Sequence, residues 1–388
     1  MNDKLAWAYL SRVVEGPSRH VQALLSAGRS AEEIAHGVRT RASWVGPLLG
    51  ETESRYAFDS MNRDLEQAAA VGGRLITPED DEWPTEEFDV SFGFATAGAS
   101  PFPRTYQSDA VAPHALWVRG GNLSGMFARS LGVVGTRTMS TYGRAATTIL
   151  VTSLSSHRYT VVSGGAMGID TAAHEAALSV GGTTVAFFAC GIDRTYPSSN
   201  AALFEKIAGS GGALISEYAP GLSPKRHRFL TRNRLVAAVT QGSVVVEAGF
   251  RSGALNTLTW CSGLGRVSMA VPGPITSNTS TGCHHKIRDG QAQLVTSGDD
   301  VRSLLEPVGT LDVDGQYELA LQPDAIQRLS RNELRIYDAL PTQGARDTSD
   351  VAQDAGLPIA LTVHILVDLQ RRGLVARDGA SWQRGEVA

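Results

Sequence analysis

The sequence predicts an α/β protein whose central sheet is doubly wound and mostly parallel, with helices on both faces. From residue 131 onward, short apolar runs bounded by glycine alternate with amphipathic stretches. The runs are LGVVG, YTVVSGG, GTTVAFFACG, GALISEY, GSVVVEAG and VSMAVPG. Their β-branched residues do not alternate with polar ones, as is typical of strands buried on both faces. The stretches between them have helical spacing, and parallel strands require such crossover helices.

The chain of 388 residues exceeds the length that one hydrophobic core serves well, so several domains are expected. We assign the α/β domain to residues 116–307. A small helical domain at 1–76 and a connector rich in proline and acidic residues at 77–115 precede it. An acidic linker at 308–325 leads to a last domain at 326–388. Its order of helix, helix, helix and hairpin predicts a winged helix-turn-helix.

Composition indicates a cytoplasmic protein without contact to membranes. The first residues, MNDKLAWAYLSRVVEG, lack the basic start and apolar run of a secretory signal. No apolar stretch approaches the ~20 residues of a membrane span. The three cysteines, Cys190, Cys261 and Cys283, are too few and odd in number for a disulfide framework, which fits a reducing compartment.

Charge is distributed unevenly along the chain, although its formal net value is only −4. Residues 1–115 carry 10 Lys and Arg against 17 Asp and Glu. Residues 116–307 carry 17 Lys and Arg against 10 Asp and Glu. The α/β domain is therefore the part that we expect to meet a polyanion.

The stretch VVSGGAMGIDTAAHEAAL at 161–178 predicts a strand, a glycine-rich turn and a helix. Open α/β sheets bind ligands beyond the carboxyl ends of their strands, where a helix N-terminus offers N–H groups to an anion. Ser163, Gly164 and Gly165 lie at such a point. We expect them to let a phosphate approach the backbone.

Other interpretations of this turn fit less well. A dinucleotide-binding G-x-G-x-x-G would need its first glycine at Ser163, and no Gly-Lys-Ser/Thr of a P-loop follows. Gly168 and Asp170 are expected to serve structure, the glycine through a tight turn and the carboxylate through the helix dipole. Asp170 and His174 stand four residues apart, and such a pair can be catalytic or can hold a turn together.

The segment SPKRHRFLTRNRLVAAV at 223–239 is the most basic part of the chain. Five basic residues fall within ten positions: Lys225, Arg226, Arg228, Arg232 and Arg234. No Asp or Glu occurs from Tyr218 to Val246, whereas a solvated charged face would mix both signs. Phe229 lies among these cations. Basic groups around an aromatic ring are typical of single-stranded nucleic acid binding, because the cations bind phosphates while the ring stacks on a base.

Residues that suit phosphate binding also follow two further strands. They are Thr136, Arg137, Arg251, Ser252 and Gly253. Glu247 stands between the strand and the second group, where it is expected to orient neighbouring donors. Several strand ends thus direct such groups to one rim of the sheet, and this convergence predicts a binding site there.

These motifs resemble the DNA-processing protein A family (DprA, also called Smf). The resemblance covers roughly residues 116–300 and rests on VVGTR, SGGAMGID, ACGIDRTYPSSNAAL, LISEYAPG, PKRHRFLTRNR and VVVEAGFRSGAL in this order. It implies a Rossmann-like α/β domain, a SAM-like N-terminal domain and a C-terminal winged helix.

The resemblance further implies a protein that binds single-stranded DNA in a positive pocket and forms a homodimer. Such a protein protects incoming DNA and loads the RecA recombinase in natural transformation and recombination. No catalytic residue, metal or cofactor is implied. The strand-end residues and the family resemblance, taken together, give the expected DNA-binding residues. They are Thr136, Arg137, Ser163, Gly164, Gly165, Lys225, Phe229, Arg232, Asn233, Arg234, Ser252 and Gly253.

Two alternative functions remain open. Related Rossmann-like enzymes hydrolyse nucleotides with a glutamate after a glycine loop, and Glu247 could take that place. The P-G-G-x-G-T loop of those enzymes is absent before it, however. A scaffold that binds partners but no DNA is the second alternative.

The segment TGCHHKIRDGQAQ is expected to be a loop at the rim of the site, where Lys286 and Arg288 add positive charge. Its Cys283, His284 and His285 superficially resemble a metal site. Adjacent ligands without distant partners make a poor zinc site, so no metal is expected.

Overall fold

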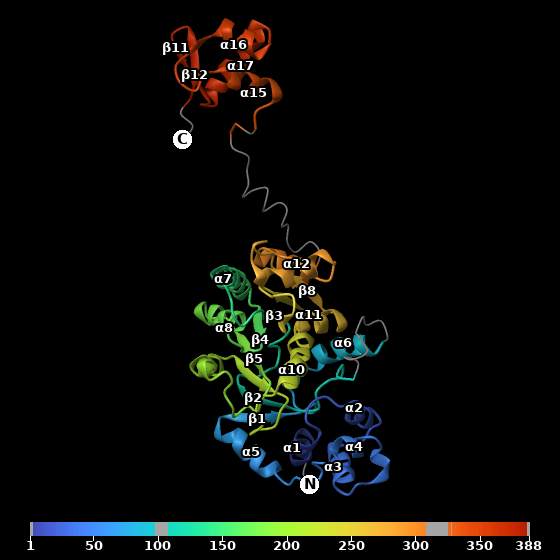
Figure 1. The fold of residues 1–388 in the computed structure, drawn as a ribbon. Helices are drawn as coiled ribbons and strands as arrows, with labels where there is room; N and C mark the ends of the chain where they lie inside the picture. Colours follow the sequence, from blue (N-terminus) through green and yellow to red (C-terminus); the bar gives the residue numbers. More distant parts are fainter. Residues whose placement is uncertain (1–2, 98–107, 308–324, 327, 386–388) are drawn as a thin grey trace. The chain divides into compact units, whose positions relative to one another are not determined.

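A computed structural model describes residues 3–97, 108–307, 325–326 and 328–385. The chain divides into two compact units, Met1–Leu311 and Asp312–Ala388 (Figure 1). Each unit is described by itself.

The first unit is built around one nine-stranded sheet with the order β1-β2-β6-β5-β4-β3-β7-β8-β9. The strands are β1 Gly73–Ile76, β2 Leu116–Gly120, β3 Ser130–Val134, β4 Thr160–Ser163, β5 Thr184–Phe188, β6 Ala213–Ser216, β7 Gly242–Val245, β8 Val267–Ala270 and β9 Gln293–Leu294. β3 to β9 run parallel to their neighbours, whereas β1 and β2 are antiparallel additions at one edge. The predicted α/β fold with a mostly parallel sheet is confirmed.

The helices of this unit lie on both faces of the sheet (Figure 1). They are α1 Asp3–Val14, α2 Arg19–Ser26, α3 Ala31–Arg39, α4 Leu48–Thr52, α5 Met61–Ala70, α6 Thr85–Thr96, α7 Thr141–Ser156, α8 Ile169–Ser179, α9 Ala201–Gly209, α10 Arg226–Ala238, α11 Ala254–Gly263, α12 Thr281–Arg288 and α13 Gly298–Leu305. Three single 3₁₀ turns accompany them at Ser43–Val45, Ser198–Asn200 and Asn278–Ser280.

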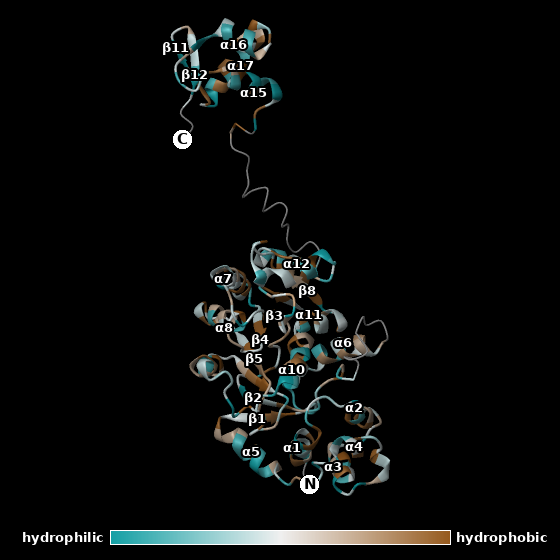
Figure 2. Ribbon diagram, viewed as in Figure 1, coloured by the Kyte–Doolittle hydropathy of each residue, from teal (hydrophilic) through white to brown (hydrophobic). Residues whose placement is uncertain are grey.

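Alternate residues of the inner strands belong to different cores. Val161 packs with α7 and α8, while its neighbour Val162 packs with α10 and α11. Because successive side chains of a strand point to opposite faces, both faces need apolar residues. Figure 2 shows these hydrophobic residues on the inner strands. This is why the strands lack polar alternation in the sequence.

The N-terminal helices share a core with one edge of the same sheet. Trp7 of α1 packs in the cluster that contains Trp117 of β2 and Phe188 of β5. The Trp117 indole also donates a hydrogen bond to Ser11 Oγ at 2.9 Å. The helices therefore lie directly against the sheet within the first unit.

The segment 77–115, expected as a connector into the α/β domain, contains α6, whose Phe88 and Phe92 are buried with α10 and α11. The expectation of a loop at 281–293 is wrong, because this segment contains α12 and the first residue of β9. Tertiary packing stabilises α12, because its Cys283 is completely buried against β7.

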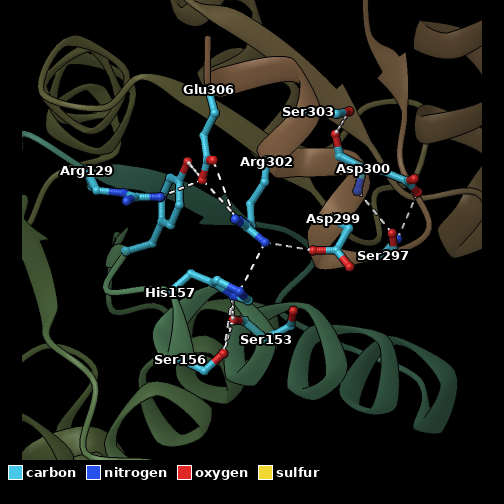
Figure 3. A network of polar contacts seen from close by, with 11 residues as sticks. Arg129, Ser153, Ser156, His157, Ser297, Asp299, Asp300, Arg302, Ser303 and Glu306 are labelled. Atoms are coloured by element: carbon cyan, nitrogen blue, oxygen red, sulfur yellow. Dashed lines mark hydrogen bonds and ion pairs between the residues drawn. The ribbon is translucent and has the colours of Figure 1, made fainter. Parts of the chain in front are cut away.

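The last helix of the first unit, α13, is fixed to α7 by a polar network (Figure 3). Arg302 donates to Asp299 at 3.0 Å, to Glu306 at 3.0 Å and to Nε2 of His157 at 3.0 Å. Arg129, before β3, also pairs with Glu306 at 2.5 Å. The network joins the end of the unit to the strand at its centre.

Among its described residues, the second unit contains three helices and a small antiparallel sheet with the order β10-β12-β11. Its elements are α15 Arg331–Ala339, β10 Arg346–Asp347, α16 Thr348–Ala355, α17 Ile359–Arg371, β11 Val375–Asp378 and β12 Ser381–Arg384. Ile336, Leu366 and Trp382 contribute to a core of its own. Among the described helices none alone is long and apolar enough to cross a membrane; α16 and α17 pass only as a pair bent by 105°.

Candidate nucleic-acid interface

A cavity with a volume of about 650 Å³ lies at the rim of the sheet, beyond the carboxyl ends of β3, β4 and β7. β4 pairs with one edge of β3, and β7, which comes later in the chain, pairs with the other edge. The cavity thus occupies the switch point of the topology, where open α/β sheets bind ligands. Its lining includes Arg137, Gly164, Asp170, Tyr196, Arg226, Phe229, Leu230, Arg232, Asn233, Ser252 and Gly253.

An aromatic pair and an arginine form one wall of this cavity. The ring centroids of Tyr196 and Phe229 are 5.5 Å apart at an interplanar angle of 52°. The Arg137 guanidinium lies 5.3 Å from the Phe229 centroid, within the range of a cation–π contact. Arg137 and Arg226 are both exposed. The wall therefore combines a ring for base stacking with two cations that can reach a phosphate.

Arg232 is buried and holds two strand ends together. It donates to the backbone oxygen of Gly164 at 2.7 Å and to that of Phe187. Burial lowers the pKa of Arg232, while the nearby Asp170 carboxylate opposes that shift. A Cβ on Gly164 would stand 2.7 Å from Cζ of Arg232. Glycine is thus required here by the close approach of the guanidinium.

Asp170 stabilises the glycine turn from the first turn of α8. Its carboxylate accepts hydrogen bonds from the backbone N–H groups of Gly164 at 3.2 Å and Ala166 at 3.3 Å. Burial raises the pKa of Asp170, and the Arg232 charge opposes this shift. The Gly164 amide, which we expected to face a phosphate, is therefore already bonded within the turn.

His174 does not form a pair with Asp170. Its Nδ1 lies 2.7 Å from the Thr184 hydroxyl on β5, and the ring is completely buried. Burial lowers the pKa of His174 to about 3, so the imidazole is neutral at physiological pH. The catalytic alternative for this pair is thus not supported by the geometry.

Two arginines of the basic segment lie away from the cavity. Arg234, expected to contact DNA, is buried and pairs with the buried Glu217 at 2.5 Å. Arg228 is buried as well and pairs with Glu15, after α1, at 2.5 Å. Both cations neutralise carboxylates inside the protein, so they are not available to a ligand in this structure.

Four other expected residues do not line the cavity. The Ser163 hydroxyl is buried and donates to the Val133 oxygen at 2.6 Å. Gly165 has a φ of +69° and lies against the Phe204 ring of α9. The Thr136 N–H donates to the backbone oxygen of Glu247 at 2.7 Å. Lys225 is exposed and is the N-cap residue of α10, directly before the first residue of that helix.

Glu247 is buried and serves the start of α7. Its carboxylate accepts hydrogen bonds from Ser140 Oγ at 2.6 Å, Ser140 N at 2.9 Å and Thr279 Oγ1 at 2.8 Å. A Cβ on Gly143 would collide with this carboxylate. The oxygens of Glu247 are thus engaged by the protein, and the position fits a structural role.

Tyr196 and Leu230 were missed as cavity residues by the sequence prediction. Tyr196 follows β5 in the run GIDRTYPSS, so an aromatic residue after a parallel strand was the available signal. Leu230 gives no such signal, because only the position of α10 exposes half of its side chain.

In the part of the chain that the structure describes, no group of three His, Cys, Asp or Glu residues is placed to hold a metal ion. His284 instead approaches the Gly273 backbone through Nε2.

A family model, related sequences and a solved structure are similar to this chain. The model of the family "DNA recombination-mediator protein A" matches residues 93–306. A DNA processing protein DprA from Mycobacterium tuberculosis is 44% identical over 377 residues, which cover 96% of this chain and 92% of the relative. Protein Smf of Escherichia coli is 34% identical over 68% of this chain and 70% of its own length. The crystal structure of DprA from Streptococcus pneumoniae matches with a TM-score of 0.63 and 29% identity, covering 79% of this chain and 100% of that chain.

Proposed function

Because this chain belongs to the DNA recombination-mediator protein A family, we propose that it binds single-stranded DNA in the cavity at the carboxyl ends of β3, β4 and β7. The observation that carries the proposal is the cluster of Arg137, Tyr196 and Phe229 on one wall. Two neighbouring aromatic rings beside an exposed guanidinium suit an unpaired base and its phosphate.

The buried groups keep this site in shape. Arg232 and Asp170 both form hydrogen bonds with the backbone of Gly164, so the glycine turn of the lining is ordered before DNA binds. Asn233 also lies in the lining, where its side chain contacts Asn256 at 3.1 Å. Ser252 and Gly253 close the side next to β7.

In its biological role, the protein protects incoming single-stranded DNA and loads the RecA recombinase during natural transformation or recombination. It acts in the cytoplasm as a homodimer. The N-terminal helices serve as a SAM-like domain and the second unit as a winged helix. The family membership supports these assignments, and the order of elements in the second unit agrees with the last one.

Fluorescence anisotropy of a labelled oligo-dT tests the proposed site. Replacing Phe229 by Ala should weaken binding by about 5- to 150-fold, because base stacking contributes about 1–3 kcal/mol. Arg137→Glu together with Lys225→Glu should abolish binding, because the two introduced carboxylates repel the phosphates. Phe58→Ala removes an exposed ring outside the cavity and serves as the control. Unchanged affinity in both site variants would refute the site.

The geometry gives no support to nucleotide hydrolysis through Glu247. Its carboxylate is bonded to Ser140 and Thr279, which leaves no oxygen directed at the cavity. Release of free base from nucleoside monophosphates, measured by chromatography, would contradict the binding function proposed here.

A further inference from the structure

A second cavity adjoins the proposed DNA site. It has a volume of about 420 Å³, within the usual range of ligand pockets, about 300–1,000 Å³. Leu230, Ser252 and Gly253 line both cavities, so they form a shared border. We propose that this second cavity binds a further nucleotide of the same DNA strand, an inference that rests on the proposed function.

The second cavity has its own aromatic surface. Phe250, in the turn after β7, is 62% exposed and lies edge-to-face with His285 of α12, at a centroid distance of 5.1 Å. Apart from this contact, most of the Phe250 side chain is open to a ligand. A ring beside a shallow cavity offers stacking to an unpaired base, as Phe229 does in the first cavity.

Charge in the second cavity also suits a polyanion. Arg251, next to Phe250 in the sequence, is exposed, and Lys286 of α12 also lines the cavity, where its ammonium donates to Gln291 Oε1 at 2.6 Å. None of the described residues that line this cavity is Asp or Glu. The nearby Asp289 is paired with His285 at 2.8 Å and with Arg288 at 3.3 Å. The cavity therefore presents unopposed cations at its lining.

Continuity between the cavities explains the exposed Leu230. This side chain stands half exposed between Phe229 and the second cavity. A strand that stacks one base on Phe229 can pass its backbone over the small residues Ser252 and Gly253 and place a later base at Phe250. The two rings thus define two subsites along one strand.

The test compares strand lengths. Anisotropy is measured with oligo-dT strands from about 4 to about 16 nucleotides, the range of site sizes known for single-strand binding folds. Phe250→Ala should leave the affinity for the shortest strand unchanged and weaken the affinity for the longest by about 5- to 150-fold. Phe229→Ala should weaken binding at every length. Phe58→Ala, which removes an exposed ring elsewhere, should change neither.

A second pair of variants tests the cations independently of the ring. Arg251→Gln with Lys286→Gln should reduce the slope of log affinity against log salt by about 1.4 for long strands, because each phosphate contact on a single strand contributes about 0.7. The slope for the shortest strand should stay the same.

The outcomes separate this inference from the proposed function. No binding of any strand by the wild-type protein would refute the proposed function itself. Normal binding with equal affinity of wild type and Phe250→Ala at all lengths would overturn the second subsite alone. Loss of self-association in Phe250→Ala, with long-strand affinity unchanged, would assign the cavity to a protein contact and equally overturn it.

Discussion

At the scale of single residues, the glycine turn depends on the absence of a side chain at one position. Gly164→Ala would force its Cβ into the guanidinium of Arg232, which cannot move without losing two backbone acceptors. We expect a loss of about 1–3 kcal/mol in unfolding free energy, measured by urea denaturation. Gly253→Ala is the control, since its Cβ would meet nothing within 4 Å at a φ of −61°. Equal stability of both variants would contradict this account.

A buried histidine makes stability depend on pH. The pKa of His174 is lowered to about 3, whereas an unfolded chain protonates histidine near pH 6.5. Between these values the unfolded state binds more protons, so stability falls as pH drops from about 6.5. His174→Leu should reduce this slope by about 1.4 kcal/mol per pH unit. His114, with a pKa lowered to about 4, leaves part of the slope in place.

Denaturation curves between pH 7 and pH 4 measure this effect. His227→Gln, which removes an exposed histidine of α10, is the control and should keep the wild-type slope. Thr184 still donates to the Val161 oxygen in His174→Leu, so no polar group of that pair is left alone. The same slope in wild type and His174→Leu would show that this imidazole is not buried as a neutral group.

At the scale of elements, the basic helix α10 is fixed to the N-terminal helices through Glu15. Its carboxylate accepts from Arg228 at 3.0 and 2.5 Å and pairs with Arg55 at 2.5 Å. Glu15→Ala would leave Arg228 buried without its charge partner. We expect a loss of about 3 kcal/mol in unfolding free energy. DNA affinity should fall as well, because Phe229 follows Arg228 directly.

The matched control is Glu205→Ala, which breaks a more exposed pair with Arg119. Such pairs contribute at most about 1 kcal/mol. Chemical denaturation and oligo-dT anisotropy on both variants provide the measurement. A Glu15 variant with wild-type affinity would show that the first turn of α10 keeps its position without this ion pair.

The strands of the parallel sheet could be predicted from the sequence. Which arginines of the basic segment are buried and which are exposed could not be predicted. Apolar runs such as YTVVSGG need only local composition to be recognised. Arg228 looks like a DNA contact because its partner Glu15 is 213 residues away in sequence. Arg234 is neutralised by Glu217, which lies 17 residues earlier, just outside the basic segment. Local charge density predicts where cations concentrate, but long-range ion pairs decide which of them reach the surface.

At the scale of the whole molecule, the two units have separate cores. All residues of both cavities belong to the first unit. A chain that ends after residue 307 should therefore fold and bind oligo-dT with unchanged affinity. Thermal unfolding and anisotropy provide the measurement. Weaker binding by the shortened chain would assign part of the DNA contact to the second unit.

The family could be recognised from the order of the motifs, and that recognition is confirmed by the family model and by relatives along most of the chain. The predicted cavity residues are only partly brought together: Arg137, Gly164, Phe229, Arg232, Asn233, Ser252 and Gly253 line the cavity. Placing Tyr196 beside Phe229 required the structure, because the loop after β5 and the helix α10 meet only in the fold.

The locked glycine turn has a consequence for the kinetics of binding. Asp170 and Arg232 fix the backbone around Gly164 before any ligand binds. The conformational entropy of this turn is therefore lost during folding and not during DNA binding. What remains to be ordered on association is chiefly the DNA strand and a few exposed side chains. Substitutions in the cavity should therefore change the dissociation rate far more than the association rate, and the lifetime of the complex records how well the bases stack.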